Sequence, residues 1–168
     1  MVISGAADSY GIYLAGRGSN TLTNNATVKV NRSSAYAEGK KAVALYAENG
    51  SINNSGALEV GAKDAVINGG IGIETDGGNV TNGGTITVYG NGSVLNGQNG
   101  NVTNNEKGQL NIYTDGKASA YGIYLAGSTG NTITNKASIF INRYGAYAQA
   151  ASTGNYGIWT DNAKIVNS

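Results

Sequence analysis

Residues 80–88, Val80-Thr81-Asn82-Gly83-Gly84-Thr85-Ile86-Thr87-Val88, decide the fold of this chain. Apolar and polar residues alternate on both sides of an Asn-Gly-Gly turn, which is the pattern of two short strands that each bury one face. Asparagine and glycine suit the turn because both tolerate positive φ. Strands of about three to five residues are too short for a sandwich, so the stretch predicts one part of a repetitive, stacked β structure.

The pattern of an apolar residue followed two positions later by asparagine recurs six times along the chain. A second short strand follows the first five copies, and a third strand precedes each copy. Three strands in a period of 21 to 35 residues are typical of a solenoid. The apolar residues are Leu22, Ile52, Val80, Val102, Ile133 and Ile165, and the asparagines are Asn24, Asn54, Asn82, Asn104, Asn135 and Asn167. The following strands are residues 28–30, 58–60, 86–88, 110–112 and 139–141, and the preceding strand cores are Ile12, Leu45, Ile73, Val94, Ile123 and Ile158.

We therefore expect residues 1–168 to form one right-handed parallel β-helix of about six three-stranded coils. Each strand would pair with its equivalent one coil away, about 4.8 Å distant. Like residues then stack on like, and the six asparagines would form a structural amide ladder at a turn where the backbone enters the left-handed region. An internal duplication supports this arrangement, because residues 10–37 match residues 121–148 at 17 of 28 positions.

Composition excludes several classes of function. The net charge is +1 and only 12% of residues are charged, which argues against a nucleic-acid partner, since such binding needs clustered cations. Cysteine and histidine are absent, so disulfides, a structural zinc site and Cys- or His-based catalysis are not expected. We expect no metal and no cofactor. There is no apolar stretch long enough for a membrane span, and the first residues do not resemble a signal peptide. We expect the chain to be an internal fragment of a longer exported protein that does not itself insert into a membrane.

The repeated units resemble the coils of autotransporter passenger domains. Residues 52–60 and 80–88 follow the "apolar-x-Asn-x-Gly-x-Ile-x-Val" pattern of that family, and the Gly-Ile-Tyr and Gly-Ile-Trp segments fit it as well. The resemblance implies a right-handed β-helix that type V secretion displays on the surface of a Gram-negative bacterium. It also implies a role in adhesion or self-association, with a host-cell or bacterial protein or glycan, or a second copy, as partner. The family has no common catalytic motif, so the resemblance implies no catalytic residue.

Aromatic residues are the candidate binding residues. The outward position after the preceding strand core holds an aromatic residue in four periods, and such a row could stack on sugars or on another protein. The alternative is that the rings stack only on one another and stabilise neighbouring coils. Further tyrosines lie in two long inserts, where binding residues are common. The outward position holds Tyr13, Tyr46, Glu74, Leu95, Tyr124 and Trp159, and the tyrosines of the inserts are Tyr36, Tyr144 and Tyr147.

Two other functions remain as alternatives to a non-enzymatic adhesive segment. The first is a passive stalk that carries a recognition site elsewhere. The second is a polysaccharide-degrading enzyme, because Glu48 and Asp76 occupy equivalent turn positions, Asp161 recurs in the last period, and a carboxylate pair about 5 Å apart could serve a glycosidase. Acidic residues are also favoured in turns for backbone reasons. Ice binding is disfavoured, because the row that contains Thr21 is interrupted by Ser51 and Asn79.

Overall fold

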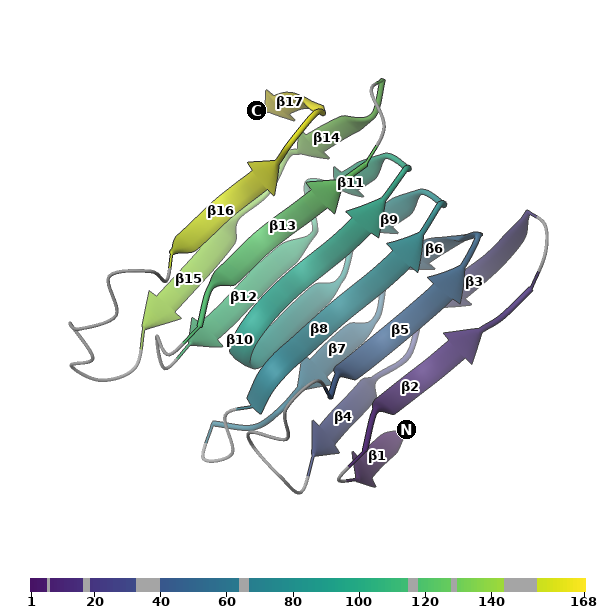
Figure 1. Cartoon of the computed structure of the whole chain (residues 1–168), viewed down its shortest axis with the longest axis vertical. Coiled ribbons are helices and arrows are strands. Elements are labelled where there is room, and N and C mark those ends of the chain that lie inside the picture. Colours follow the sequence, from purple (N-terminus) through teal and green to yellow (C-terminus); the bar gives the residue numbers. More distant parts are fainter. Residues whose placement is uncertain are drawn as a thin grey trace.

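A computed structural model describes residues 1–5, 7–16, 19–32, 40–63, 67–114, 118–127, 130–143 and 154–168 (Figure 1). Every regular element in these ranges is a β-strand, and every strand pairing is parallel. The protein is therefore all-β with parallel sheets, as the short alternating segments predict. Tyr36, Tyr144 and Tyr147 lie outside the described residues.

The strands fall into three rows, which we name sheets A, B and C. Along the sequence the chain visits the three sheets in turn, and each strand pairs with the strand of the same sheet one period away (Figure 1). Strand β10 (Thr85–Gln98) is long enough to run through both sheet A and sheet B, and it joins them into one continuous sheet. Sheet C remains separate.

The bounds of the other strands follow the order of the sheets. Sheet A also contains β1 (Val2–Gly5), β4 (Val28–Arg32), β7 (Ala57–Val60), β12 (Gln109–Thr114) and β15 (Ile139–Arg143). Sheet B also contains β2 (Ser9–Leu14), β5 (Ala42–Glu48), β8 (Ile67–Asp76), β13 (Ala120–Ala126) and β16 (Asn155–Thr160). Sheet C contains β3 (Asn20–Asn24), β6 (Gly50–Asn54), β9 (Val80–Asn82), β11 (Val102–Asn104), β14 (Thr132–Asn135) and β17 (Lys164–Asn167).

The register confirms the predicted columns of sheets A and C. In sheet C, Ile52 pairs with both Leu22 and Val80, and in sheet A, Ile86 pairs with both Leu58 and Leu110. These side chains are buried and belong to one hydrophobic core that lies between the sheets. Each contributes roughly 1.5–3 kcal/mol through burial. The core therefore explains why the apolar residues recur in register over so many periods.

One predicted column is wrong by a single residue in sheet B. The sequence places Val94 in the row of Ile73, but Leu95 pairs with Ile73 and Ile123. Asn96, and not Leu95, therefore holds the outward position, while Val94 and Leu95 are both fully buried. The cause is a β-bulge: the register shifts between Asn91 and Gly92, and alternation cannot locate the row when two adjacent apolar residues are buried.

The six asparagines of sheet C form an unbroken amide ladder. Asn82 lies at its centre, where its Nδ2 donates to Asn104 Oδ1 at 3.0 Å and its Oδ1 accepts from Asn54 Nδ2 at 2.8 Å. Equivalent bonds continue to Asn24 at one end and to Asn135 and Asn167 at the other. The amides of Asn24, Asn54, Asn82 and Asn135 also bind the turn that follows them, as Asn82 Nδ2 does with the Gly84 carbonyl at 2.9 Å.

The expected backbone conformation at this ladder is wrong. Among the described residues, the only ones other than glycine with positive φ are Asn49 and Asn99, and both lie in turns between sheets B and C. The ladder asparagines instead remain in the strands and satisfy the turn through their side chains, which replaces the need for left-handed geometry.

Candidate functional site

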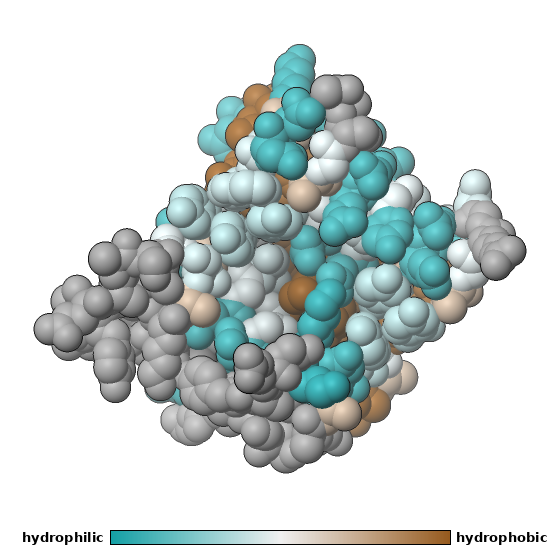
Figure 2. Space-filling model, viewed as in Figure 1, coloured by the Kyte–Doolittle hydropathy of each residue, from teal (hydrophilic) through white to brown (hydrophobic). Residues whose placement is uncertain are grey.

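The candidate site is the outer face of sheet B, where one register row crosses all six strands of the sheet. Tyr13 pairs with Tyr46, which pairs with Glu74, and Tyr124 pairs with Trp159. Asn96 lies between Glu74 and Tyr124 and links the two halves. We name these positions the outer row. Sheet B faces the viewer in Figures 1 and 2, and the surface in view is largely hydrophilic or intermediate, with small apolar areas.

The N-terminal end of the outer row is an aromatic cluster on β2 and β5. The rings of Tyr13 and Tyr46 stack with centroids 4.8 Å apart and planes 22° apart. Tyr10, which the sequence reasoning did not select, packs edge-on against both, at 5.1 Å from Tyr13 and 5.7 Å from Tyr46. The spacing of the stack equals the interstrand distance, so the pairing of β2 with β5 sets the ring contact.

A second aromatic cluster lies on β13 and β16. Tyr124 and Trp159 stack with centroids 4.5 Å apart and planes only 3° apart. Beside them, Tyr121 and Tyr156 form a parallel stack at 5.2 Å, and Tyr121 meets Tyr124 edge-on. Tyr121 and Tyr156 were missed from the sequence, although their signal is the tyrosine that precedes Gly-Ile-Tyr and Gly-Ile-Trp. All four predicted strand aromatics thus have an unpredicted tyrosine ring as an edge-on neighbour.

Further rings lie on sheet A, away from the outer row. Tyr89 and Tyr113 stack at 5.1 Å, and Phe140 meets Tyr113 edge-on at 6.1 Å. Phe140 is half exposed. The sequence reasoning did not select these residues, because the aromatic position of sheet A is occupied in only some of its strands. Ring stacking between neighbouring strands is therefore a general feature of this chain and supports the sheets themselves.

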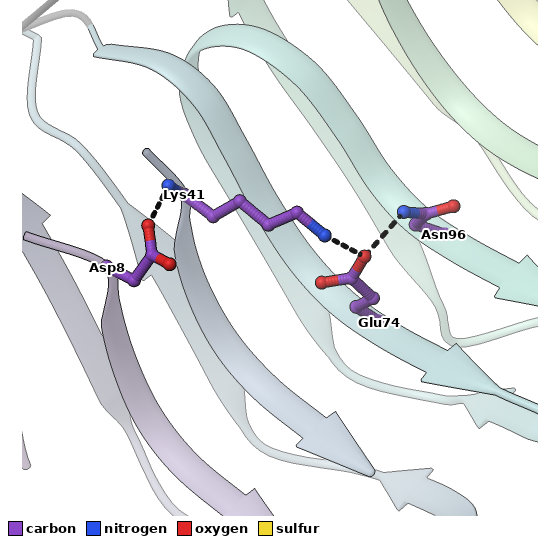
Figure 3. A network of polar contacts seen from close by, with 4 residues as sticks. All are labelled: Asp8, Lys41, Glu74 and Asn96. Carbon is purple, nitrogen blue, oxygen red and sulfur yellow. Dashed lines mark hydrogen bonds and ion pairs between the residues drawn. The ribbon is translucent and has the colours of Figure 1, made fainter. Parts of the chain in front are cut away.

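Polar residues separate the two aromatic clusters of the outer row. Glu74 on β8 accepts from Lys41 Nζ at 2.8 Å and from Asn96 Nδ2 at 3.1 Å, both through Oε1 (Figure 3). The backbone of Lys41 donates to Asp8 Oδ1 at 2.8 Å, so the network extends from before β2 to β10. The Glu74 side chain is only 10% exposed, whereas that of Lys41 is 48% exposed. The ion pair compensates a carboxylate that would otherwise be buried unpaired.

Two acceptor atoms of this network have no hydrogen-bond partner among the residues that the structure describes. They are Glu74 Oε2 and Asn96 Oδ1, and both are buried. The orientation of the Asn96 amide follows from its neighbour, because a carboxylate oxygen only accepts and must face the amide NH₂ group. Both unpaired atoms are acceptors, so the network can take additional donors when its side chains move.

The ring stacking limits what the outer row can bind. In each stack the two rings cover one face of each other, so Tyr46 and Tyr124 keep free only the faces that point toward Glu74 and Asn96. About 14 Å, or three interstrand spacings, separate these two residues along the row. A flat group could rest on a free ring face and donate hydrogen bonds to the polar residues between. The outer row could therefore bind a ligand on its open surface.

Acidic neighbours change the titration of the tyrosines in the first cluster. Burial, followed by the negative charge of Asp76 and smaller effects of Tyr13, Glu74 and Glu48, raises the pKa of Tyr46 from 10.0 to about 12. Burial and the charge of Asp8 likewise raise the pKa of Tyr10. Burial opposes the charge of Lys41, but the hydrogen bond and charge of Glu74 outweigh it, so the pKa of Lys41 is raised.

The raised pKa of Tyr46 predicts a loss of stability in alkali. The folded chain keeps this phenol proton at a pH where the unfolded chain releases it, so the contribution is complete below pH 10.0 and is lost as the pH rises toward about 12. We expect the free energy of unfolding in urea to fall less steeply above pH 10.0 in Tyr46→Phe, which keeps the ring, than in the wild type. An identical pH slope in both proteins would contradict the assignment.

The other predicted residues do not form a second site within the described part of the chain. Glu48 and Asp76 are register neighbours, as expected, and Gln98 continues their row. Asp161 is an exposed residue after β16. Among the described residues there is no cluster of three or more acidic, histidine or cysteine side chains that could hold a metal ion. The same residues contain no helix long and apolar enough to cross a membrane.

Comparisons with known proteins do not assign this chain to a group. No family model matches it, no curated protein matches it, and no solved structure matches it.

Proposed function

We propose that this chain is a non-enzymatic, adhesive segment of a bacterial surface protein built like an autotransporter passenger domain. The observation that carries the proposal is the outer row of sheet B, which combines two partly exposed ring clusters with a polar centre on a repetitive frame. Adhesion at such a surface would depend on avidity over several weak contacts. The partner would be a protein or glycan of a host or bacterial cell, or a second copy of the chain.

We also propose that the fold is a right-handed parallel β-helix. The parallel pairing of every strand with its equivalent one period away supports this reading, as does the cyclic order of the three sheets along the sequence. The amide ladder adds a third argument, since stacked asparagines need identical turns in successive periods. In this proposal the segment is exported with a longer chain and displayed outside the cell.

A passive stalk is the second candidate function. It is favoured by the ring stacks themselves, because rings that cover one another already stabilise neighbouring strands without any ligand. The enzyme alternative has less support. Glu48 and Asp76 are adjacent in the register as the last residues of β5 and β8, but no acidic cluster surrounds them among the described residues.

Adhesion assays with ring-deleted variants test the proposal. We expect Tyr124→Ser combined with Trp159→Ser to reduce saturable binding of bead-immobilised protein to host cells, bacteria or itself by about tenfold, because one cluster of anchors is lost. The variant should remain folded by circular dichroism, since the core lies on the opposite face of the strand. Tyr113→Ser on sheet A is the matched control, because it removes a stacked ring from a different face.

The outcomes separate the two candidates. Saturable binding that falls in the double variant and persists in the control supports an adhesive outer row. Binding of none of the three targets by the folded wild type favours the stalk, and equal binding by all variants places recognition away from the outer row.

A further inference from the structure

A groove crosses the turns that follow the amide ladder, on a different side of the molecule from the outer row. It consists of two adjoining hollows of about 370 and 250 Å³. Ser55, Gly83 and Asn105 line both hollows, so the two form one continuous groove. Its direction follows the stacking of the periods, because these three residues each come directly after a ladder asparagine.

Two irregularities of the repeat create this groove. The residue after the ladder asparagine carries a side chain in the neighbouring periods but is Gly83 in the third, which lowers the floor there. A Cβ atom added at Gly83 would meet only the Asn54 carbonyl oxygen, at 3.9 Å, so the space above it is open. The fourth period contains the extra turn residues Glu106 and Lys107, and these line the deeper hollow.

Apart from Gly83, the residues that line the groove have polar side chains, and several of these have unused hydrogen-bonding capacity. Ser55 Oγ donates to Asn25 Oδ1 at 2.5 Å. The side chains of Asn53, Thr81 and Asn105 make no hydrogen bond within the described part of the chain, and they present hydroxyl and amide groups to the groove. Such groups both donate and accept, as the hydroxyl groups of a sugar do.

Charge at one end of the groove favours an anion. Lys107 and Lys136 line the deeper hollow together with Glu106, which leaves one formal positive charge in excess. Neither lysine forms an ion pair with another described residue. The two ion pairs among the described residues involve Lys29 and Lys41. Nucleic acid fits poorly, since two lysines neutralise few phosphates and no ring lines the groove for base stacking.

We propose that this groove binds an acidic oligosaccharide, with sugar hydroxyl groups on the Asn, Ser and Thr side chains and a carboxylate or sulfate near Lys107 and Lys136. The rows from Asn25 to Lys136 extend over four interstrand spacings, about 19 Å, which suits an extended chain of several sugars. This site shares no residue with the outer row. The inference therefore does not depend on the adhesive role proposed for the tyrosines.

The test measures binding of tetragalacturonate, a uronic-acid oligosaccharide, by titration calorimetry of the full chain. We expect saturable binding that weakens with added salt, because part of the attraction is between exposed charges. Gly83→Asn should reduce the affinity at least about tenfold, which corresponds to about 1.4 kcal/mol, because it fills the floor of the groove. The exchange of both Lys107 and Lys136 for Gln should have a similar effect.

A matched control and two competing probes make the result decisive. Gly157→Asn places the same side chain at another open position, on β16, where an added Cβ atom meets nothing within 4 Å, and this variant should bind normally. The proposal is overturned if tetragalacturonate does not bind, or if Gly83→Asn binds as the wild type does. Equal binding of a glutamate oligopeptide would overturn the sugar assignment, and equal binding of neutral cellotetraose would overturn the role of the lysines.

Discussion

Asn82→Ala should cost about 3 kcal/mol of the free energy of unfolding. The Asn82 side chain is fully buried at the centre of the amide ladder and takes part in bonds with Asn54, Asn104 and Gly84. Alanine would leave Asn104 Oδ1 and the Gly84 carbonyl without this donor in a site that water does not reach. Each buried polar atom left unpaired costs about 1–3 kcal/mol. Urea unfolding followed by circular dichroism measures the loss.

The end of the same ladder provides the control. Asn167 is exposed, and in the ladder it accepts one bond from Asn135 Nδ2, which also donates to the Ala137 carbonyl. Asn167→Ala should therefore cost at most about 1 kcal/mol. Equal losses for the two variants would mean that the ladder does not contribute through burial of its amides.

Gly84→Ala should destabilise the fold by about 3 kcal/mol, whereas Gly83→Ala, one residue earlier, should not. A Cβ atom at Gly84 would lie 2.0 Å from the Gly56 carbonyl oxygen of the neighbouring period, so the backbone of one period must move. At Gly83 the nearest atom would be 3.9 Å away, and φ is not positive. Alanine there should stabilise by about 0.4–1 kcal/mol, because it restricts the unfolded chain.

Both variants change one glycine of the same turn to alanine. A difference between their free energies of unfolding in urea therefore reflects the position of the glycine and not the kind of substitution. Destabilisation by Gly83→Ala equal to that by Gly84→Ala would contradict the close approach of adjacent periods. A Gly84→Ala variant as stable as the wild type would also contradict the close approach of adjacent periods.

Much of the fold is predictable from the sequence because its signals are local and repeated. The apolar-x-Asn unit identifies sheet C, its register and its ladder, since a one-residue slip would turn Ile52 or Val80 toward solvent. The row in sheet B is misassigned at Val94, because the bulge in the pairing of β8 with β10 changes the register and leaves no trace in the alternation. The left-handed turn was wrongly expected, because asparagine can satisfy a turn through its side chain as well as through its backbone.

The candidate site was predictable only in part, for a different reason. The outer row follows from counting along each strand, and this locates Tyr13, Tyr46 and Tyr124. The ion pair between Lys41 and Glu74 does not follow from counting, because a long lysine side chain reaches a residue that is not its register partner. The groove near Gly83 depends on a missing side chain and on two extra residues, which are departures from the repeat.

The pairing of each strand with only its nearest equivalents has a mechanical consequence. In sheet C, paired residues are separated by 22 to 32 positions along the chain. Tension applied along the stacking direction would therefore break the contacts between one pair of neighbouring periods at a time. Each rupture would release roughly 70–115 Å of extended chain, at about 3.3–3.6 Å per residue. A molecule of this construction yields to force in discrete steps and remains folded beyond each break, as a shock-absorbing tether would.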